Sequence, residues 1–350
     1  MNIAKPIEAW IDRLELRPGV FPHKLDLISG NLLLVELSAA EISAASFLDQ
    51  RVLKQTTKWV WVPWPLVSDI FKKVPVAKPP GFIFHVGHCG STLLSRLLEF
   101  ADDTQCLREP LPLRTLAQDF ADAGDGRSFL TQQARQEHLQ TLSKMWCRGA
   151  VNTVIKATSI CTDLLADINT SVPGSKSIFM YNRPETHIAT LLAGQNALTD
   201  LKGFAQLRLQ RLQQKTGLDI QLNQLSAGQL AALSWLSETS SASRSLEAFP
   251  QHIALLEFDS LLDRPHETLT RMLHHLDMTA AVETVEKAVQ SPVLQTYSKA
   301  PEHQYNAQTR AAILADSRVK FRQDIYGALD WLEDLAGRSE IVATTMQKFS

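Results

Sequence analysis

A short glycine-rich segment, residues 87–92 with the sequence Gly-His-Cys-Gly-Ser-Thr, gathers groups that could bind an anion. It follows an apolar run and precedes a helical pattern. Its backbone N–H groups and the hydroxyls of Ser91 and Thr92 would therefore converge at a helix N-terminus, where phosphate binds well. Nucleotide triphosphatases require Gly-Lys-Ser/Thr at this point, and here Ser91 follows Gly90 with no lysine, which argues against ATP hydrolysis. The segment predicts a local anion site, with an ordinary tight turn as the alternative.

The elements that would position this segment follow the pattern of an α/β fold. Apolar runs alternate with helical patterns, the runs at 81–86, 153–156, 177–181 and 252–257 and the helices at 91–100, 184–193 and 265–276. This alternation predicts a mostly parallel central sheet flanked by helices, with a P-loop-like strand-turn-helix at its centre. Sites in such folds lie beyond the carboxyl ends of the strands, where the polar segments of this chain fall.

The chain divides into an accessory segment and a main domain. In residues 1–80, tryptophans 59, 61 and 64 alternate along a strand-like stretch interrupted by Pro63 and Pro65, and residues 78–80 (Lys-Pro-Pro) form a stiff linker. Residues 81–350 form the main domain. Within it, a pattern that is helical throughout from 201 to 246 predicts a helical cover over the sheet, around 194–248.

The composition and charge exclude several classes of partner. Of 350 residues, 45% are hydrophobic, and 35 Lys and Arg against 37 Asp and Glu give a net charge of −2. Without a run of like charges or an apolar stretch of about 18 residues, we expect no nucleic-acid partner and no membrane partner. Four cysteines without Cys-x-x-Cys spacing and no apolar signal core at the start predict a cytoplasmic protein. His85, His88 and Cys89 can bind metal, but no second cluster accompanies them, so no metal is expected.

Residues 82–98 resemble the 5′-phosphosulfate loop of sulfotransferases that use 3′-phosphoadenosine 5′-phosphosulfate (PAPS). Further segments are similar to the family in the same order. They are residues 107–110, like a segment that carries a catalytic glutamate; 177–190, like the 3′-phosphate segment; 256–265; and, more weakly, the Ser-Lys element at 297–301. The resemblance covers about residues 81–301.

The resemblance implies a role for each candidate residue. Glu109 would be the base that deprotonates the acceptor, and Lys156 and His88 would stabilise charge at the transferring sulfuryl group. The implied cofactor-binding residues are Gly87, His88, Cys89, Gly90, Ser91, Thr92, Arg183, Thr190, Ser298 and Lys299.

Three positions depart from the family pattern. His88 stands where lysine or arginine is usual, Cys89 replaces a serine, and Asn182 stands at the arginine of the 3′-phosphate segment, with Arg183 displaced by one residue. A neutral imidazole offers one donor where an ammonium offers three, although an adjacent phosphate favours the protonated ring. These departures bear on both the 5′-phosphate and the 3′-phosphate contacts.

The sequence therefore predicts a sulfotransferase that moves a sulfuryl group from PAPS to a hydroxyl or amine of a small-molecule or biopolymer acceptor. The reaction would leave adenosine 3′,5′-bisphosphate (PAP) and need no metal. A P-loop small-molecule kinase is one alternative, against which the missing lysine counts. A nucleotide-binding homologue without catalytic activity is the other, and the three departures favour it.

Overall fold

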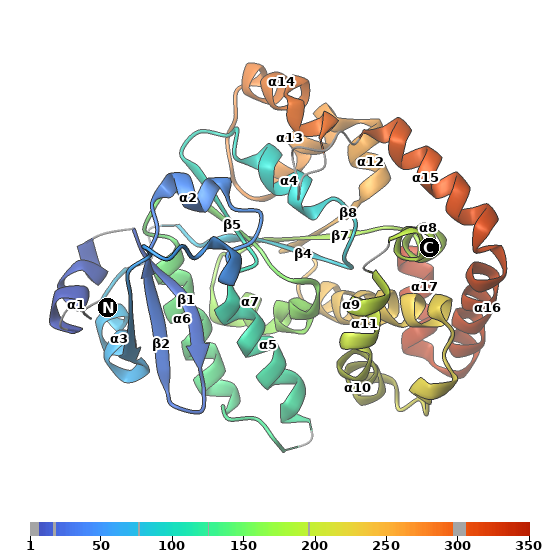
Figure 1. Cartoon of the computed structure of the whole chain (residues 1–350), viewed down its shortest axis with the longest axis horizontal. Coiled ribbons are helices and arrows are strands. Elements are labelled where there is room, and N and C mark those ends of the chain that lie inside the picture. Colours follow the sequence, from blue (N-terminus) through green and yellow to red (C-terminus); the bar gives the residue numbers. More distant parts are fainter. Residues whose placement is uncertain (1–6, 17–18, 76–77, 125, 195–196, 297–305) are drawn as a thin grey trace.

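The central element of the fold is a parallel sheet (Figure 1). In the computed structural model, which describes residues 7–16, 19–75, 78–124, 126–194, 197–296 and 306–350, five strands lie in the order β5-β6-β4-β7-β8. The strands are β4 (Gly81–His85), β5 (Thr104–Arg108), β6 (Asn152–Lys156), β7 (Ser177–Tyr181) and β8 (Ile253–Glu257). Neighbouring strands are parallel throughout. The predicted α/β fold with a mostly parallel central sheet is confirmed.

Within the central sheet, the edge strand β5 is the strand that the sequence analysis missed. Its sequence, Thr-Gln-Cys-Leu-Arg, lacks an apolar run and ends in an arginine. Arg108 is nevertheless fully buried, because its guanidinium donates hydrogen bonds to Ser95 Oγ and to the carbonyl oxygen of Ser43 and pairs with Glu99. A buried charge that is satisfied in this way gives no hydropathy signal.

Helices cover both faces of the sheet (Figure 1). On one side lie α4 (Ser91–Leu98), α13 (Pro265–His275) and α14 (Val282–Gln290), and on the other lie α5 (Leu111–Ala123), α6 (Gln132–Trp146) and α7 (Leu165–Ser171). The predicted helices at 91–100, 184–193 and 265–276 are present as α4, α8 (Pro184–Ala193) and α13. Because both faces are covered, the inner strands β4, β6 and β7 are almost wholly buried, as parallel strands usually are.

The helical cover is not continuous, so the prediction of a pattern that is helical throughout 201–246 is wrong in one place. Its helices are α9 (Ala197–Gly203), α10 (Ala205–Thr216) and α11 (Ala227–Ala248). Gly217, with a φ of 68°, ends α10, and a capping box formed by Ser226 and Gln229 begins α11. The short 3₁₀ turn η3 (Leu222–Gln224) lies between them. Leucine spacing indicated the helices, but the caps decide where they end.

The N-terminal part of the chain forms a small antiparallel sheet. Its strands are β1 (Val20–Asp26), β2 (Asn31–Glu36) and β3 (Trp59–Pro63), with α1 (Ile7–Leu16), α2 (Ala39–Ala44), η1 (Gln50–Val52) and α3 (Trp64–Lys72) around them. The three tryptophans of the predicted strand-like stretch belong to two different elements. Trp59 and Trp61 belong to β3, whereas Trp64 begins α3, because Pro65 suits a first helical turn. Trp64 stacks on His138 of α6 with ring centroids 3.9 Å apart, so the N-terminal part packs on the helices that cover the central sheet.

Three C-terminal helices complete the core beside α8 and α11, and they are α15 (Ala307–Lys320), α16 (Arg322–Arg338) and α17 (Glu340–Phe349). Earlier in the chain, α12 (Phe258–Asp263) packs on α13 and β8, and the 3₁₀ turn η4 (Pro292–Gln295) packs on α4 and α14. The α15 helix packs along α8, and α16 and α17 pack on α11. Phe349 meets Phe179 of β7 edge-on, with ring centroids 5.6 Å apart.

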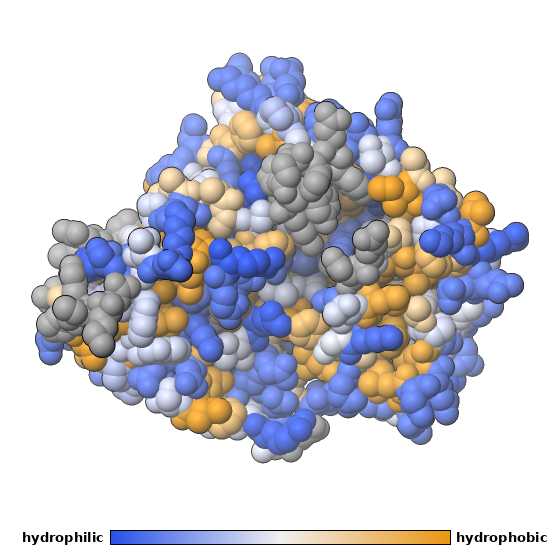
Figure 2. Space-filling view, in the orientation of Figure 1, coloured by the Kyte–Doolittle hydropathy of each residue, from blue (hydrophilic) through white to orange (hydrophobic). Residues whose placement is uncertain are grey.

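The surface is mixed in character. Figure 2 shows hydrophilic side chains spread over the visible face with apolar patches between them. Among the described residues, none of the helices combines the length and apolar composition needed to cross a bilayer.

Candidate active site

The glycine-rich segment forms a tight loop between the end of β4 and the start of α4. Gly87, His88 and Gly90 have φ angles of 88°, 50° and 73°. A turn that contains left-handed residues can direct successive backbone N–H groups toward a common point and so favour anion binding. Glycine meets this demand without strain, but His88 does not, so the surrounding structure must hold it there.

Side chains from the neighbouring strands hold the loop. His85 Nδ1 accepts a hydrogen bond from the Gly87 N–H at 2.9 Å, which leaves Nε2 to donate to the carbonyl oxygen of Ala157 at 2.9 Å. Asn182 Nδ2 donates to the carbonyl oxygen of His88 at 3.3 Å. Cys89 is buried, and its thiol donates to the carbonyl oxygen of Met180 at 3.3 Å. Cys89 therefore contributes its backbone to the loop, while its side chain is hydrogen-bonded to strand β7.

Thr92 supplies a buried hydroxyl to this segment. Among the described residues, its Oγ1 has no hydrogen-bond partner. A buried hydroxyl without a partner is costly, so a ligand oxygen that accepts its hydrogen bond would be favoured. A phosphate group fits this requirement.

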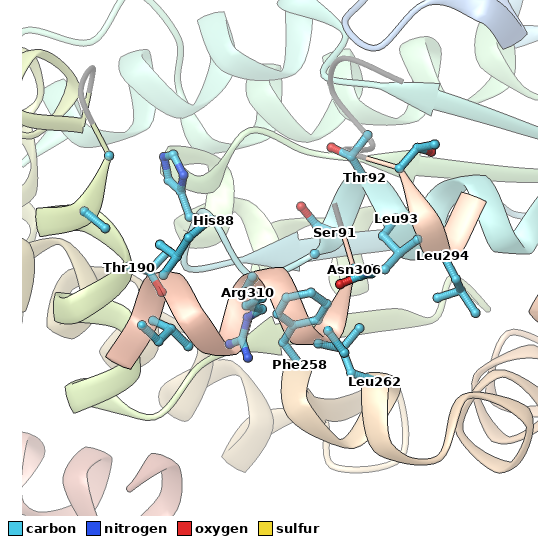
Figure 3. A pocket seen from close by; sticks show the side chains of 18 residues that line it. His88, Ser91, Thr92, Leu93, Thr190, Phe258, Leu262, Leu294, Asn306 and Arg310 are labelled. Atoms are coloured by element: carbon cyan, nitrogen blue, oxygen red, sulfur yellow. The ribbon is translucent and has the colours of Figure 1, made fainter. Parts of the chain in front are cut away.

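A first cavity of about 270 Å³ opens on one side of the loop (Figure 3). Residues 88–93 form one wall, and Thr190, Phe258, Leu262, Leu294 and Arg310 lie around the rest. The ring of Phe258 lies directly against the loop, because a Cβ added to Gly90 would stand 2.1 Å from its Cε2 atom. Gly90 is thus required both by its φ and by this contact.

Arg310 is the residue of the first cavity that sequence analysis missed. It comes from α15, is 8% exposed, and lies over the ring of Phe258 at 4.8 Å from the centroid. Its Nη1 is 2.5 Å from Asp259 Oδ1, and its Nη2 donates to Asn182 Oδ1 at 3.4 Å. Asn182 stands where the family carries an arginine, and the fold supplies a guanidinium to that place from a helix far along the chain. The arginine missing at position 182 was the one available signal.

The two predicted 3′-phosphate residues are placed differently. Thr190 lines the first cavity and donates its own hydroxyl to the carbonyl oxygen of Thr186 at 2.6 Å. Arg183 is outside the cavity lining, its side chain is 62% exposed, and its Nε donates to Glu257 Oε1 at 2.9 Å. The displacement by one residue leaves Asn182 facing the loop and turns the guanidinium toward Glu257.

A second cavity of about 130 Å³ lies on the other side of the loop and contains Glu109. Glu109 follows β5 with a φ of 57°, and its N–H donates to the carbonyl oxygen of Lys156 at 2.7 Å. The carboxylate forms an ion pair with the Lys156 ammonium, which is fully buried at the end of β6. The fold therefore brings together the two residues that the resemblance assigned to proton and charge handling.

His88 stands between the two cavities. It is the residue of the loop whose side chain lies at the boundary, since it lines the first cavity beside Ser91 and the second beside Glu109. Phe47, from the accessory segment, also lines the second cavity. A group transferred from a ligand in the first cavity to one in the second would pass His88.

Burial fixes the protonation of several groups inside the molecule. It lowers the pKa of His187 to about 3, with the nearby His88 and Arg208 acting in the same direction, so His187 is neutral. Its Nε2 is 3.0 Å from Ser234 Oγ. Burial also raises the pKa of the Cys147 and Cys161 thiols to about 12. These cysteines therefore supply no thiolate at neutral pH.

Two further predictions concern the Ser-Lys element and metal binding. Ser298 and Lys299 lie outside the residues that the structure describes. In the described part of the chain, no group of three or more His, Cys, Asp and Glu side chains is arranged to hold a metal ion.

No family model and no curated protein matches the sequence, but solved structures do. A sulfotransferase from Mycobacterium avium is 12% identical, with 91% of this chain and 97% of that chain covered and a TM-score of 0.39. Mouse sulfotransferase SULT7A1, solved in complex with PAP, is 9% identical, with coverages of 81% and 93% and a TM-score of 0.42. The sulfotransferase domain of the curacin biosynthetic pathway is 14% identical, with coverages of 66% and 84% and a TM-score of 0.40.

These structural neighbours are named for the family that the motifs resemble. Their identities and TM-scores are low, so the functional conclusion depends on the geometry of the site itself.

Proposed function

We propose that this chain is a sulfotransferase that moves a sulfuryl group from PAPS to a hydroxyl or amine acceptor and leaves PAP. The observation that carries the proposal is the loop at residues 87–92. It combines left-handed backbone, an unpartnered buried Thr92 hydroxyl and a position between two cavities, one beside Arg310 and the other at Glu109. A nucleotide donor and an acceptor would meet across this loop.

On the donor side, the loop N–H groups with Ser91 and Thr92 would hold the 5′-phosphate. We assign the 3′-phosphate to Arg310 and Thr190 in place of Arg183, because the Arg310 guanidinium belongs to the cavity. Arginine is well suited to this role, since its planar fork donates two parallel hydrogen bonds to a phosphate. Phe258, Leu262 and Leu294 offer apolar surface on which the adenine ring of the nucleotide could pack.

On the acceptor side, Glu109 would take the proton. Its carboxylate pairs with the Lys156 ammonium at the edge of the second cavity, where its oxygens can accept a proton from the acceptor. In the transfer step, the acceptor oxygen or nitrogen bonds to sulfur while the bond from sulfur to the bridging phosphate oxygen breaks. The electron pair of that bond leaves with PAP, and the acceptor proton passes to Glu109.

Negative charge develops on the bridging oxygen during this step. His88, at the boundary of the two cavities, and the loop N–H groups are placed to stabilise it. As in phosphoryl transfer, catalysis would come mainly from positioning and electrostatic stabilisation.

Calorimetric titration tests the proposal. PAP should bind with micromolar-class affinity, and adenosine 5′-phosphate and Mg-ATP much more weakly, because only PAP carries the 3′-phosphate. Arg310→Ala should lower the affinity for PAP about ten- to a hundredfold, as expected for a charged hydrogen-bond donor. Arg183→Ala is the matched control and should leave the affinity nearly unchanged.

Other outcomes would favour the alternatives. Preferential binding of Mg-ATP would indicate a kinase, and equal affinity for PAP and adenosine 5′-phosphate would remove the 3′-phosphate site. PAP binding without turnover over a broad acceptor panel would indicate a homologue that has lost catalysis.

A further inference from the structure

The second cavity carries a buried arginine that the proposed transfer does not use. Arg208, on α10, lines this cavity together with Glu109 and is 4% exposed. The remaining lining is mostly polar and includes Ser159 and Ser234. A small polar cavity is a poor site for a large apolar acceptor and suits a compact, hydrophilic one.

The Arg208 guanidinium has unused hydrogen-bonding capacity. Its Nη2 donates to Asp200 Oδ2 at 3.0 Å, and its Nη1 is 3.4 Å from the carbonyl oxygen of Asp200. Its Nε is buried and has no hydrogen-bond partner in the described part of the chain. A guanidinium has five N–H donors, and a buried donor left without a partner is costly. A ligand oxygen beside Arg208 would give this donor a partner.

The existing partner of Arg208 is poorly placed to hold it permanently. Asp200 belongs to the short helix α9, and its side chain is 45% exposed. Solvent weakens an ion pair of this kind, so a ligand carboxylate can share or replace it. At the second cavity Arg208 pairs with Asp200 and Lys156 pairs with Glu109, and Asp200 is the more exposed of the two carboxylates.

We propose that the acceptor is a small hydroxy acid or amino acid whose carboxylate binds Arg208 while its hydroxyl or amine faces Glu109. This inference rests on the proposed sulfotransferase function. The acceptor oxygen or nitrogen would bond to the sulfur of PAPS, PAP would leave with the electron pair of the broken S–O bond, and Glu109 would take the proton. The product is the O-sulfate or N-sulfamate of the acid, and the cavity volume of about 130 Å³ limits the acceptor to a compact molecule.

The test compares each acid with its neutral amide in the presence of saturating PAP. The probes are glycolate, L-lactate, 3-hydroxybutyrate and L-serine, each beside its primary amide, with binding measured by calorimetry and turnover by release of PAP from PAPS. At least one acid should bind at least tenfold more tightly than its amide. Arg208→Gln should raise the KM of that acid about ten- to a hundredfold and leave the KM of the amide unchanged. Arg208→Lys should restore part of the loss.

Two further variants separate recognition from structure. Asp200→Asn removes the competing carboxylate and should lower the KM of the acid without affecting the amide. Arg338→Gln, which breaks an exposed ion pair with Asp334, should change neither. If Arg208 only fastens α9 to α10, Arg208→Gln will lower the melting temperature and affect acid and amide alike.

The outcomes distinguish this inference from the proposed function. Failure of PAP to bind would overturn both. PAP binding with acids and amides bound equally, or with none of the acids bound, would overturn the carboxylate site and leave the sulfotransferase proposal standing.

Discussion

Glu109 and Lys156 form an ion pair whose members have separate roles in the proposed transfer. Glu109→Gln keeps the shape of the side chain but removes the group that accepts the proton. We expect turnover to fall about 10²- to 10⁴-fold while the affinity for PAP stays near that of the wild type. Steady-state release of PAP measures the first quantity, and calorimetry measures the second.

The same substitution also leaves the buried Lys156 ammonium without its carboxylate, which should lower stability. Thermal unfolding therefore accompanies the kinetics. Glu185→Gln makes the same chemical change in the exposed pair with Arg318 and should affect neither rate nor stability strongly. A turnover near wild type for Glu109→Gln would assign the base to another residue.

Thr92 gives a prediction in which stability and binding move in opposite directions. Thr92→Val replaces the unpartnered buried hydroxyl by a methyl group of similar size. Removing an unsatisfied polar group should stabilise the free protein by about 1 kcal/mol. Losing a hydrogen bond to a charged phosphate should weaken PAP binding by about 1.5 to 3 kcal/mol. Urea unfolding and calorimetry on the same preparation check both signs, and a loss of stability in the free protein would mean that Thr92 has a partner there.

At the scale of elements, the junction of β4, loop and α4 depends on Gly90. Gly90→Ala would place a Cβ in a left-handed conformation and against the Phe258 ring. The matched control is Gly217→Ala, where φ is 68° and nothing lies within 4 Å of the added atom. The conformational cost of about 1 to 2 kcal/mol is shared by both variants. Overpacking against Phe258 should add about 1 to 3 kcal/mol for Gly90 alone. Equal losses in urea unfolding would mean that the ring yields without cost.

Sequence patterns predict those elements whose signals are local. The run before Gly87 and the leucines of α4 are of this kind, and so are β6, β7 and β8. The strand β5 was missed because its burial depends on a guanidinium satisfied by residues of other elements. The role of Arg310 was missed for a similar reason, since no motif in α15 shows that the helix packs along α8 and delivers an arginine beside Asn182.

At the scale of the whole molecule, distant parts of the chain share one core and one site. Phe47 of the accessory segment lines the second cavity, and Arg310 of the C-terminal helices lines the first. Buried residues of the N-terminal sheet, the central sheet and α17 belong to a single apolar cluster. Global unfolding should therefore report on changes at the site as well as in the core.

The pH dependence of global stability follows from the buried histidines, of which His187 is the most strongly perturbed. Its pKa in the folded protein is about 3, and the ordinary value is 6.5. Below pH 6.5 the unfolded chain binds a proton that the folded chain does not. The stability is therefore fully present above pH 6.5 and decreases as the pH falls toward 3. For this one residue the loss of stability at pH 5 is about 2 kcal/mol.

Urea unfolding at pH 8 and pH 5 measures this loss. His187→Gln should reduce the difference in free energy of unfolding between the two pH values by that amount. His274→Gln, at an exposed histidine of α13, is the control that should leave the difference unchanged. Identical pH dependence in the wild type and His187→Gln would show that His187 is protonated in the folded protein or stays neutral in the unfolded chain.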